Sequence, residues 1–444
     1  MLMISPRSFP FALVLALLVL AASPFESSAG EVTDFYNTLA AEGADPWVIR
    51  HDDGWYYLCQ SMGRNVTLRR SRTITGLAAG ERKVVWSPPR GLPYSEQHWA
   101  PELHFVRGKW YVYVAADDGE NANHRMYVLE NPLPDPFQGD FTLKGKIFDP
   151  ESDKWAIDGT VLNLKDKLYF IWSGWEGDVN VDQRIYIAPM SDPWTIGGAR
   201  VELSRPTHPW EKKGGPPTIN EGPQTLVRGD RVFIVYSAAG SWTDHYCLGL
   251  LSAQTDADLL DPASWRKSPE PVFAGANGVV APGHGSFTTS PDGREDWFIY
   301  HAARFPGSGW ARSIRAQPFH WTGDGQPIFG EPASPNRPIP TPTGEPRRLR
   351  FENLGDQPRI EASVEQAGDY ALSIRFRNSA PRRDAAATMK LAVNGRDAGS
   401  IRLPRSGENW SCALVRVPLN AGANQIELTV ERDHVELDSV DLIP

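Results

Sequence analysis

The chain has 444 residues and a formal net charge of −9, which is long enough for two domains with separate hydrophobic cores. Its 45 Lys and Arg and 54 Asp and Glu form no clustered basic footprint, so we expect no nucleic-acid partner. The cysteines Cys59, Cys247 and Cys412 are odd in number and widely spaced, which predicts buried free thiols and excludes dependence on a disulfide framework.

Residues 1–30 are typical of a secretory signal peptide. Arg7 supplies a positive charge, and an apolar stretch from Phe9 to Ala22 is too short to span a bilayer comfortably. Small residues follow, which predicts cleavage near Ala29 or Gly30. An uncleaved membrane anchor is the alternative. We therefore expect a secreted or periplasmic protein with no membrane contact after cleavage.

A strand-like aromatic run recurs five times, and each run is followed by a second strand-like segment. The runs begin at Gly54, Lys109, Lys167, Arg231 and Asp296. The following segments span residues 66–71, 125–129, 184–188, 246–252 and 312–319. Turn-forming residues lie between them, and no segment shows a sustained 3.6-residue apolar period. The pattern predicts an all-β fold, with a five-bladed β-propeller over residues 31–335.

One acid or histidine precedes each aromatic run by roughly ten residues, which is the spacing of a blade's first strand. In chain order these residues are Asp45, Glu102, Asp158, Glu221 and His284. Because the first strand of every blade lines the central channel, we expect the five side chains to converge on one axis. Carboxylates in one cavity push their pKa values apart, and that is a device for acid–base chemistry.

The sequence changes character near residue 331, where proline becomes dense. Residues 336–346 are expected to form a stiff, proline-rich connector. After it, short runs of alternating apolar and polar residues predict a second all-β domain, a jelly-roll-like β-sandwich, over residues 347–444.

Five short motifs together resemble glycoside hydrolase family 43 over about residues 40–330. They are Ala44-Asp-Pro46, Trp99-Ala-Pro-Glu102, Ile157-Asp-Gly159, Glu221-Gly-Pro223 and Gly283-His-Gly285. The resemblance implies a five-bladed propeller and inverting hydrolysis of α-L-arabinofuranosides or β-D-xylosides. It assigns Asp45 as general base, Glu221 as general acid, and Asp158 as the residue that modulates the pKa of the acid and orients it.

These residue types suit the implied chemistry. Inversion needs one carboxylate to activate water and one protonated carboxyl to protonate the leaving oxygen. The acid stays protonated near neutral pH only if its pKa is raised, which a neighbouring carboxylate and burial both achieve. Asp158 as a third acid is therefore chemically useful.

The resemblance also implies roles in binding. It places His284 against a cation or its water shell on the propeller axis, with calcium as the expected structural ion and a hydrogen-bonded structural histidine as the alternative. No cofactor is required for the chemistry. Arg312 is expected to bind the sugar, whereas Arg315 should face the other way by strand alternation. Trp99 is expected either to stack on a sugar or to pack in the core, and Glu102 is a further candidate substrate contact.

Three tryptophans in loop-like stretches are candidate walls of a sugar subsite: Trp175, Trp242 and Trp310. The second domain is similar to carbohydrate-binding modules of families 6 and 35, on segments such as 367–372 and 419–424. Its opening, Arg347-Arg-Leu-Arg-Phe-Glu352, departs from the acidic opening of those modules, and few aromatic residues remain to stack on sugar. We therefore expect it to pack against the propeller as a structural domain.

The surroundings of the motifs, at residues 99–104 and 124–130, look most like those of exo-acting α-L-arabinofuranosidases. We expect an enzyme that releases arabinose from arabinan or arabino-oligosaccharides of plant cell walls, and a monomer. A β-xylosidase or β-galactofuranosidase of the same fold is the nearest alternative. A non-catalytic glycan-binding propeller and a retaining propeller fructosidase are alternatives of other kinds, and the intact set of three acids argues against the first.

Overall fold

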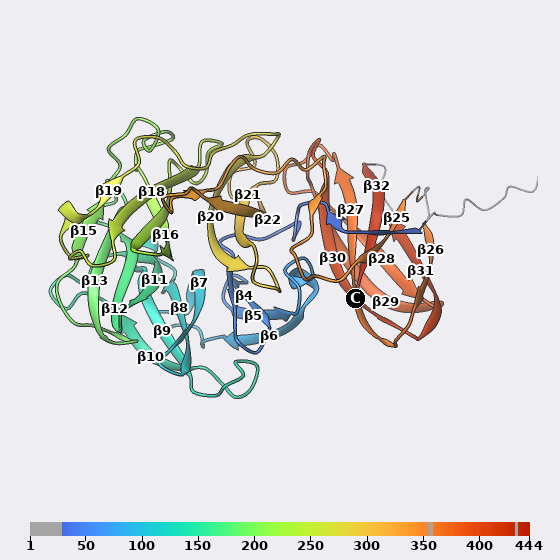
Figure 1. Ribbon diagram of the computed structural model, residues 1–444, viewed down its shortest axis with the longest axis horizontal. Coiled ribbons are helices and arrows are strands. Elements are labelled where there is room, and N and C mark those ends of the chain that lie inside the picture. Colours follow the sequence, from blue (N-terminus) through green and yellow to red (C-terminus); the bar gives the residue numbers. More distant parts are fainter. Residues whose placement is uncertain (1–28, 353, 355–357, 431–433) are drawn as a thin grey trace, which may run out of the picture.

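The computed structural model of the chain describes residues 29–352, 354, 358–430 and 434–444 (Figure 1). Almost all of the predicted signal peptide lies outside the described residues. Within these residues the only helices are single 3₁₀ turns, η1 (Leu77–Ala79), η2 (Asn121–Asn123) and η3 (Pro262–Ser264), and none of them could cross a membrane. Everything else that is regular is β-structure, so the predicted all-β class is confirmed.

The first domain is the predicted five-bladed propeller. Its sheets are antiparallel and each is built from one contiguous stretch of chain, with the strands in chain order except that β15 of the third blade pairs with β13. The first blade contains β3 (Trp47–Arg50), β4 (Tyr56–Ser61), β5 (Val66–Ser71) and β6 (Glu81–Trp86). The second contains β7 (Glu96–Val106), β8 (Lys109–Asp117), β9 (Arg125–Asn131) and β10 (Thr142–Ile147). The third is β11 (Ala156–Leu164), β12 (Lys167–Gly174), β13 (Arg184–Asp192), β14 (Thr195–Ile196), β15 (Val201–Ser204). The fourth blade contains β16 (Asn220–Arg228), β17 (Arg231–Ala238), β18 (Cys247–Gln254) and β19 (Arg266–Lys267). The fifth contains β20 (Val280–Thr289), β21 (Asp296–Ala303), β22 (Arg312–Trp321) and β23 (Pro327–Ile328).

The ring closes between the first and last blades through polar contacts. The hydroxyl of Ser286 donates to the carbonyl of Pro46 over 3.0 Å and accepts the N–H of Val48 over 2.8 Å. The chain before the first blade adds a bridge between Ala40 and Ile314. Side-chain contacts such as those of Ser286 therefore join the two blades at the seam, and Ser286 bonds to Pro46, which directly follows the predicted general base Asp45.

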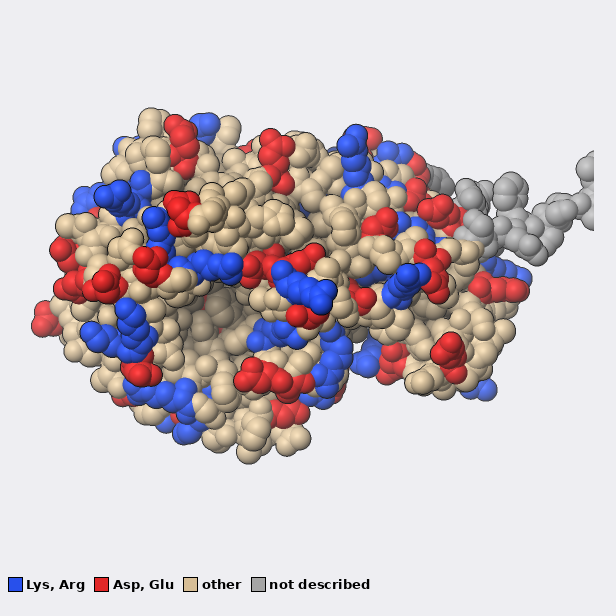
Figure 2. Space-filling model, viewed as in Figure 1, with Lys and Arg blue, Asp and Glu red and all other residues tan. Residues whose placement is uncertain are grey.

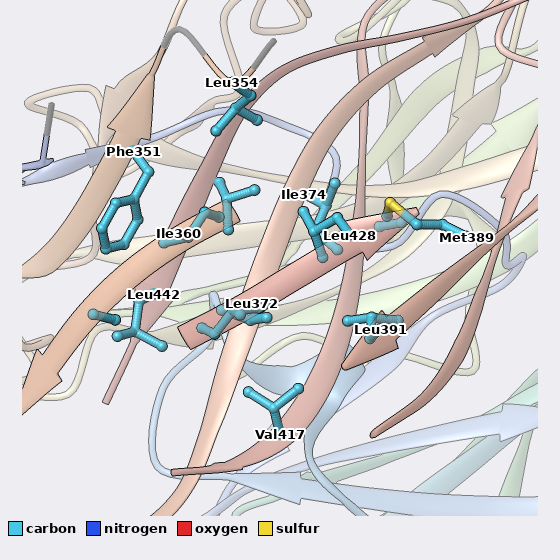
Figure 3. Packing of buried hydrophobic residues seen from close by; sticks show 14 of the residues in the cluster. Phe351, Leu354, Ile360, Leu372, Ile374, Met389, Leu391, Val417, Leu428 and Leu442 are labelled. Atoms are coloured by element: carbon cyan, nitrogen blue, oxygen red, sulfur yellow. The ribbon is translucent and has the colours of Figure 1, made fainter. Parts of the chain in front are cut away.

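The second domain is a sandwich of two antiparallel sheets. One sheet contains β1 (Ala29–Val32), β25 (Arg348–Glu352), β32 (Val435–Ile443), β27 (Gly368–Asn378) and β30 (Ser411–Leu419), in that order. The other contains β26 (Arg359–Val364), β31 (Gly422–Val430), β28 (Ala386–Val393) and β29 (Arg396–Pro404). Side chains of both sheets meet between them, for example Leu372 and Leu442 from the first and Met389 and Leu428 from the second (Figure 3). In β26 buried and exposed residues alternate strictly, as a half-buried strand requires.

The first described strand belongs to the second domain. β1 pairs with β25 at the edge of the sandwich sheet, although we assigned residues 31 and 32 to the propeller. In Figure 1 the blue start of the chain accordingly lies among the red strands. The connector is also held, because β24 (Ile339–Pro340) within it pairs with β2 (Asp34–Phe35). The chain therefore enters the propeller after β1 and β2 and leaves it before β24 and β25, and these strands pair as β1 with β25 and β2 with β24.

Buried polar contacts join the two domains. Arg350 donates two hydrogen bonds within the sandwich to Asp441, at 2.7 and 2.9 Å, and one out of the sandwich to Asp34 at 2.7 Å. The Cys412 N–H donates to the Thr38 hydroxyl over 3.1 Å. All three cysteines are free and buried, as predicted. The sandwich thus packs tightly against the propeller.

The surface carries mixed charge. On the face shown in Figure 2, basic and acidic residues are interspersed over both domains, and the propeller half is hollowed near its centre. This face shows no single-sign basic patch of the kind that nucleic-acid binding uses.

Candidate active site

A cleft of about 880 Å³ opens on the propeller and is lined by most of the predicted site residues. Asp158 projects from β11, Glu221 from β16, His284 from β20 and Arg312 from β22, and Asp45 lies just before β3. Four of the five residues that the repeat pattern placed on the axis, Asp45, Asp158, Glu221 and His284, therefore line one cleft, and Arg312 joins them from β22.

The backbone at these positions departs from regular strand geometry. Asp45, Asp158 and His284 have positive φ values of 47°, 56° and 32°, which non-glycine residues rarely adopt. The register of the inner strands shifts at Asp158 and at Glu221, because each strand carries a bulge there. Bulges next to active sites re-aim a side chain away from the sheet, and strained φ values of this kind cluster at functional sites.

Glycines flank these residues because neighbouring rings leave no space for a Cβ. A Cβ on Gly222, whose φ is +56°, would lie 2.8 Å from Cγ of His284. A Cβ on Gly283 would lie 2.4 Å from Cε1 of Tyr246. Both distances are shorter than real Cβ contacts, so the Glu-Gly and Gly-His motifs record close packing around the site.

Asp45 is surrounded by basic groups. Its Oδ1 lies 3.2 Å from Nδ1 of His284, 3.1 Å from Nδ1 of His301 and 3.4 Å from a guanidinium nitrogen of Arg312. Burial alone would raise the pKa of Asp45, but His284, His301 and Arg312 together outweigh it and hold that pKa well below its usual range. Asp45 is therefore ionised, as a general base must be.

Glu221 has the opposite tendency. Burial raises the pKa of this carboxyl above its usual range, with the charge of Asp45 adding to the rise, although a hydrogen bond from Tyr246 and the charges of His284 and Arg312 oppose it. The Tyr246 hydroxyl donates to Oε1 of Glu221 over 2.7 Å. A buried carboxyl with a raised pKa retains its proton, as a general acid must.

Asp158 is linked to Glu221 through backbone and charge. Burial, aided by the charges of Glu221 and Asp45, raises the pKa of Asp158 to about 7, while His284 and the N–H of Gly222 favour its ionised form. The N–H of Gly222 donates to Oδ2 of Asp158 over 2.9 Å. This hydrogen bond is stronger when the carboxyl is charged. The two neighbouring acids cannot both ionise freely, so we place the charge on Asp158 and the proton on Glu221.

His284 lies between the carboxylates. Its Nδ1 is 3.2 Å from Oδ1 of Asp45 and 3.9 Å from Oδ2 of Asp158. Burial would lower the pKa of His284, but Asp45, Asp158 and Glu221 outweigh it and raise it. Within the described part of the chain, no three His, Cys, Asp or Glu side chains are grouped to hold a metal ion. His284 is therefore better placed to balance the charge of two acids than to ligate a metal ion directly. A calcium ion that His284 would contact through water stays a prediction.

The two arginines of β22 point in different directions, as strand alternation predicted. Arg312 lines the cleft, contacts Asp45 and donates to the carbonyl of Ser241 over 2.9 Å. Arg315 is buried away from the cleft and donates to the carbonyl of Ala333 over 2.7 Å. Arg312 is consequently the guanidinium that can reach a substrate.

Glu102 does not line the cleft. Its two carboxylate oxygens are taken by Nε2 of His104, at 2.7 Å, and by the side-chain amide of Gln224. Both oxygens already have protein partners and the side chain is not part of the cleft lining, so its substrate contact stays a prediction. Sequence position alone could not reveal these two partners.

Aromatic side chains form the walls of the cleft. Trp99 is half-buried and lies on the ring of His124, with ring centroids 4.0 Å apart. Trp242 and Trp310 also line the cleft, as predicted, and Trp310 is 68% exposed. Trp175 does not, because it is buried against Trp155, which takes the wall position instead.

The sandwich offers no comparable aromatic surface among its described residues. Phe376 is fully buried in its core, and Trp410 is covered by the guanidinium groups of Arg375 and Arg377, 4.7 and 4.9 Å from its ring. Tyr370 packs at the edge of the same core. This arrangement agrees with a domain that packs against the propeller.

Sequence reasoning missed two residues of the site, Tyr246 and His301. Tyr246 directly precedes β18, and His301 lies in β21 just after the fifth aromatic run, so both appeared to be ordinary strand residues. The one available signal was Gly283, whose missing Cβ leaves room for the ring of Tyr246.

One cleft holds Asp45, whose pKa is lowered, Glu221, whose pKa is raised, and Asp158 as a third acid. This set of carboxyl groups is that of an acid–base glycosidase. The chain belongs to the glycosyl hydrolases family 43, whose profile matches residues 37–327.

Curated relatives and a solved structure agree with this membership. An extracellular exo-α-(1→5)-L-arabinofuranosidase of Streptomyces avermitilis is 37% identical, over 82% of this chain and 78% of its own. An α-L-arabinofuranosidase 43 of Humicola insolens is 36% identical, over 78% of this chain and 72% of its own. The crystal structure of an α-L-arabinofuranosidase from Lactobacillus brevis superposes with a TM-score of 0.64 at 38% identity, covering 68% of this chain and 98% of that one.

Proposed function

We propose that this protein is a secreted, exo-acting α-L-arabinofuranosidase that releases arabinose from arabinan or arabino-oligosaccharides with inversion. The observation that carries the proposal is that two acids in one cleft have pKa values displaced in opposite directions, that of Asp45 downward by His284, His301 and Arg312 and that of Glu221 upward by burial. Inverting hydrolysis requires this pair.

In the proposed reaction the terminal sugar lies in the cleft between the two acids. Asp45 removes a proton from a water molecule, which attacks the anomeric carbon from the face opposite the leaving group. Glu221 donates its proton to the leaving oxygen as the glycosidic bond breaks. The charge of Asp158 raises the pKa of Glu221, which keeps the proton on that carboxyl in the resting enzyme. Arg312 contributes hydrogen-bond donors for sugar hydroxyls.

The substrate class follows from the relatives. The Streptomyces protein is named as an extracellular exo-enzyme for α-(1→5) arabinofuranosides, and the Humicola protein as an α-L-arabinofuranosidase. Both are similar over most of this chain. The plant polysaccharide arabinan is thus the substrate that we propose, and export through the predicted signal peptide suits a polymer outside the cell.

A panel of nitrophenyl glycosides tests the proposal. The purified chain should cleave the α-L-arabinofuranoside faster than the β-D-xyloside or the β-D-galactofuranoside, and it should release only arabinose from arabino-oligosaccharides. Proton NMR of the first product should show the β anomer, since an α-linkage is inverted. A preference for another glycoside would reassign the substrate, and binding without cleavage would make the chain a glycan-binding propeller.

A further inference from the structure

Two buried aromatic rings lie stacked beneath the site. The rings of Tyr246 and His301 are nearly parallel, at an angle of 11°, with centroids 5.7 Å apart. Tyr246 is 1% exposed and His301 is fully buried. The separation is that of an offset stack, which is the favoured arrangement of parallel rings.

One ring contacts the general acid. The Tyr246 hydroxyl donates to Oε1 of Glu221 over 2.7 Å. The ring cannot move aside, because it occupies the space that a Cβ on Gly283 would fill. A hydrogen bond from a fixed donor holds a carboxyl in one orientation.

The other ring contacts the general base. Nδ1 of His301 is 3.1 Å from Oδ1 of Asp45 and 3.1 Å from its main-chain nitrogen. Burial, with the charge of Arg312, lowers the pKa of His301 to about 3, so the ring is neutral. One neutral tautomer donates to the carboxylate and the other accepts the N–H, so in either form His301 holds Asp45 in its left-handed conformation.

Further charged groups face these two acids. The guanidinium of Arg312 lies 5.5 Å from the centre of the Tyr246 ring and also contacts Asp45. The ionisable groups that act on either acid across the site are His284, His301, Arg312, Asp158 and Tyr246. Of these groups, Tyr246 contacts Glu221, His301 contacts Asp45, and the two rings stack on each other.

We propose that Tyr246 and His301 are positioning residues that act as one unit, and that their ring stack fixes the general acid relative to the general base. This inference rests on the proposed function, because it takes Asp45 and Glu221 as the reacting pair. Neither ring needs to touch the substrate.

Ring-conserving variants test each contact. Tyr246→Phe removes the hydrogen bond that favours the ionised form of Glu221, so the pKa of Glu221 should rise by about 1 unit. Activity is lost as pH rises through that pKa, so the basic limb of the pH–rate profile should move to higher pH while the acidic limb stays. His301→Phe should raise the pKa of Asp45, and the acidic limb alone should move to higher pH. Limbs that do not move would overturn the assignment of the two contacts.

A double-mutant cycle tests the unit. Tyr246→Leu and His301→Leu each remove half of the stack, and each should lower kcat by about 100-fold through misplacement of a reacting group. The double variant should lose little more than the worse single variant. Losses that multiply would show two independent residues and overturn the proposal. If the Leu variants do not fold, the pH limbs of the two ring-conserving Phe variants still decide whether each ring acts on its acid.

Tyr236→Phe is the matched control. Tyr236 is also fully buried, and its hydroxyl donates to Oε1 of Glu211 over 3.0 Å, away from the cleft. Neither limb should move in this variant. All profiles use arabino-oligosaccharides, whose poor leaving groups need the proton of Glu221. A wild-type chain that cleaves none contradicts the proposed function, whereas an active wild type with unmoved limbs in the variants contradicts only the positioning role.

Discussion

The main-chain N–H of Gly222 donates to Oδ2 of Asp158 over 2.9 Å, which ties the backbone beside the general acid to the third carboxylate. Gly222 directly follows Glu221, so a displacement of Asp158 would turn the chain that carries the acid. The charge of Asp158 also disfavours ionisation of its neighbour. Asp158 therefore acts on Glu221 in two ways, through position and through charge.

Asp158→Asn separates these two effects. The amide oxygen can still accept the N–H of Gly222, but the charge that raises the pKa of Glu221 is gone. The pKa of Glu221 should fall by about 1 unit, so the basic limb of the kcat profile should move to lower pH. A pH titration of kcat measures the shift. An unmoved basic limb would show that Asp158 acts through position alone.

Glu221→Gln should remove the proton donor and the basic limb with it. Substrates with poor leaving groups should lose about 10²–10⁴-fold in kcat, because they need the proton, whereas nitrophenyl glycosides should lose much less. A series of aryl arabinofuranosides with graded leaving-group pKa measures the dependence. Equal losses across the series would count against Glu221 as the acid.

Gly222→Ala should abolish activity through a clash. Its new Cβ would lie 2.8 Å from Cγ of His284, which would push that ring away from Asp45 and Asp158. Gly229→Ala is the control, because its φ is +58° and nothing lies within 4 Å of the added Cβ. Both should pay the strain of about 1–2 kcal/mol for a left-handed residue, but only Gly222→Ala should lose kcat. Thermal melts and assays on both variants decide.

Arg350→Ala should destabilise the junction of the domains. It would leave Asp441 and Asp34 without their shared partner, and breaking a buried ion pair costs about 3–5 kcal/mol. Arg347→Ala removes an exposed pair with Glu31 and should cost about 1 kcal/mol or less. Denaturant titration compares the two. Similar losses would mean that the buried network does not hold the domains together.

Deletion of residues 345–444 should lower the yield or the Tm of the propeller. The deletion removes β25, the partner of β1, and exposes apolar surface where the sandwich packed. Whatever folds should still cleave a small aryl glycoside, since every proposed catalytic residue lies before residue 313. A truncated propeller of full stability, together with tight arabinan binding by the isolated sandwich, would make the second domain a true binding module.

Much of the site could be predicted because the propeller repeats. Asp45, Asp158, Glu221 and His284 hold the same place in successive blades, so the fold alone makes them converge. Glu102 holds that place too, but each of its oxygens meets a protein partner, His104 from its own blade and Gln224 from another. A repeat predicts the place of a residue in its blade, and it does not predict which partners that residue meets.

Contacts between distant segments lay beyond the sequence for the same reason. Tyr246 and His301 come from different blades, and no local pattern marks them as neighbours. The pairing of β1 with β25 joins residues more than three hundred positions apart, and alternation within a four-residue strand is too short to predict such a partner. We predicted Trp175 as a wall of the cleft, but Trp155 lies there instead, because composition cannot tell which of two stacked rings faces the cleft.

The pairing of β1 with β25 makes the propeller an insertion between two adjacent strands of the sandwich. A protease that cut the connector once would therefore not release the catalytic domain. The fragment before the cut would still be anchored by β1, and the fragment after it by β25 and the rest of the sandwich. The nicked protein should migrate as one species under native conditions and separate only when denatured, so the two domains would remain together outside the cell even after limited proteolysis.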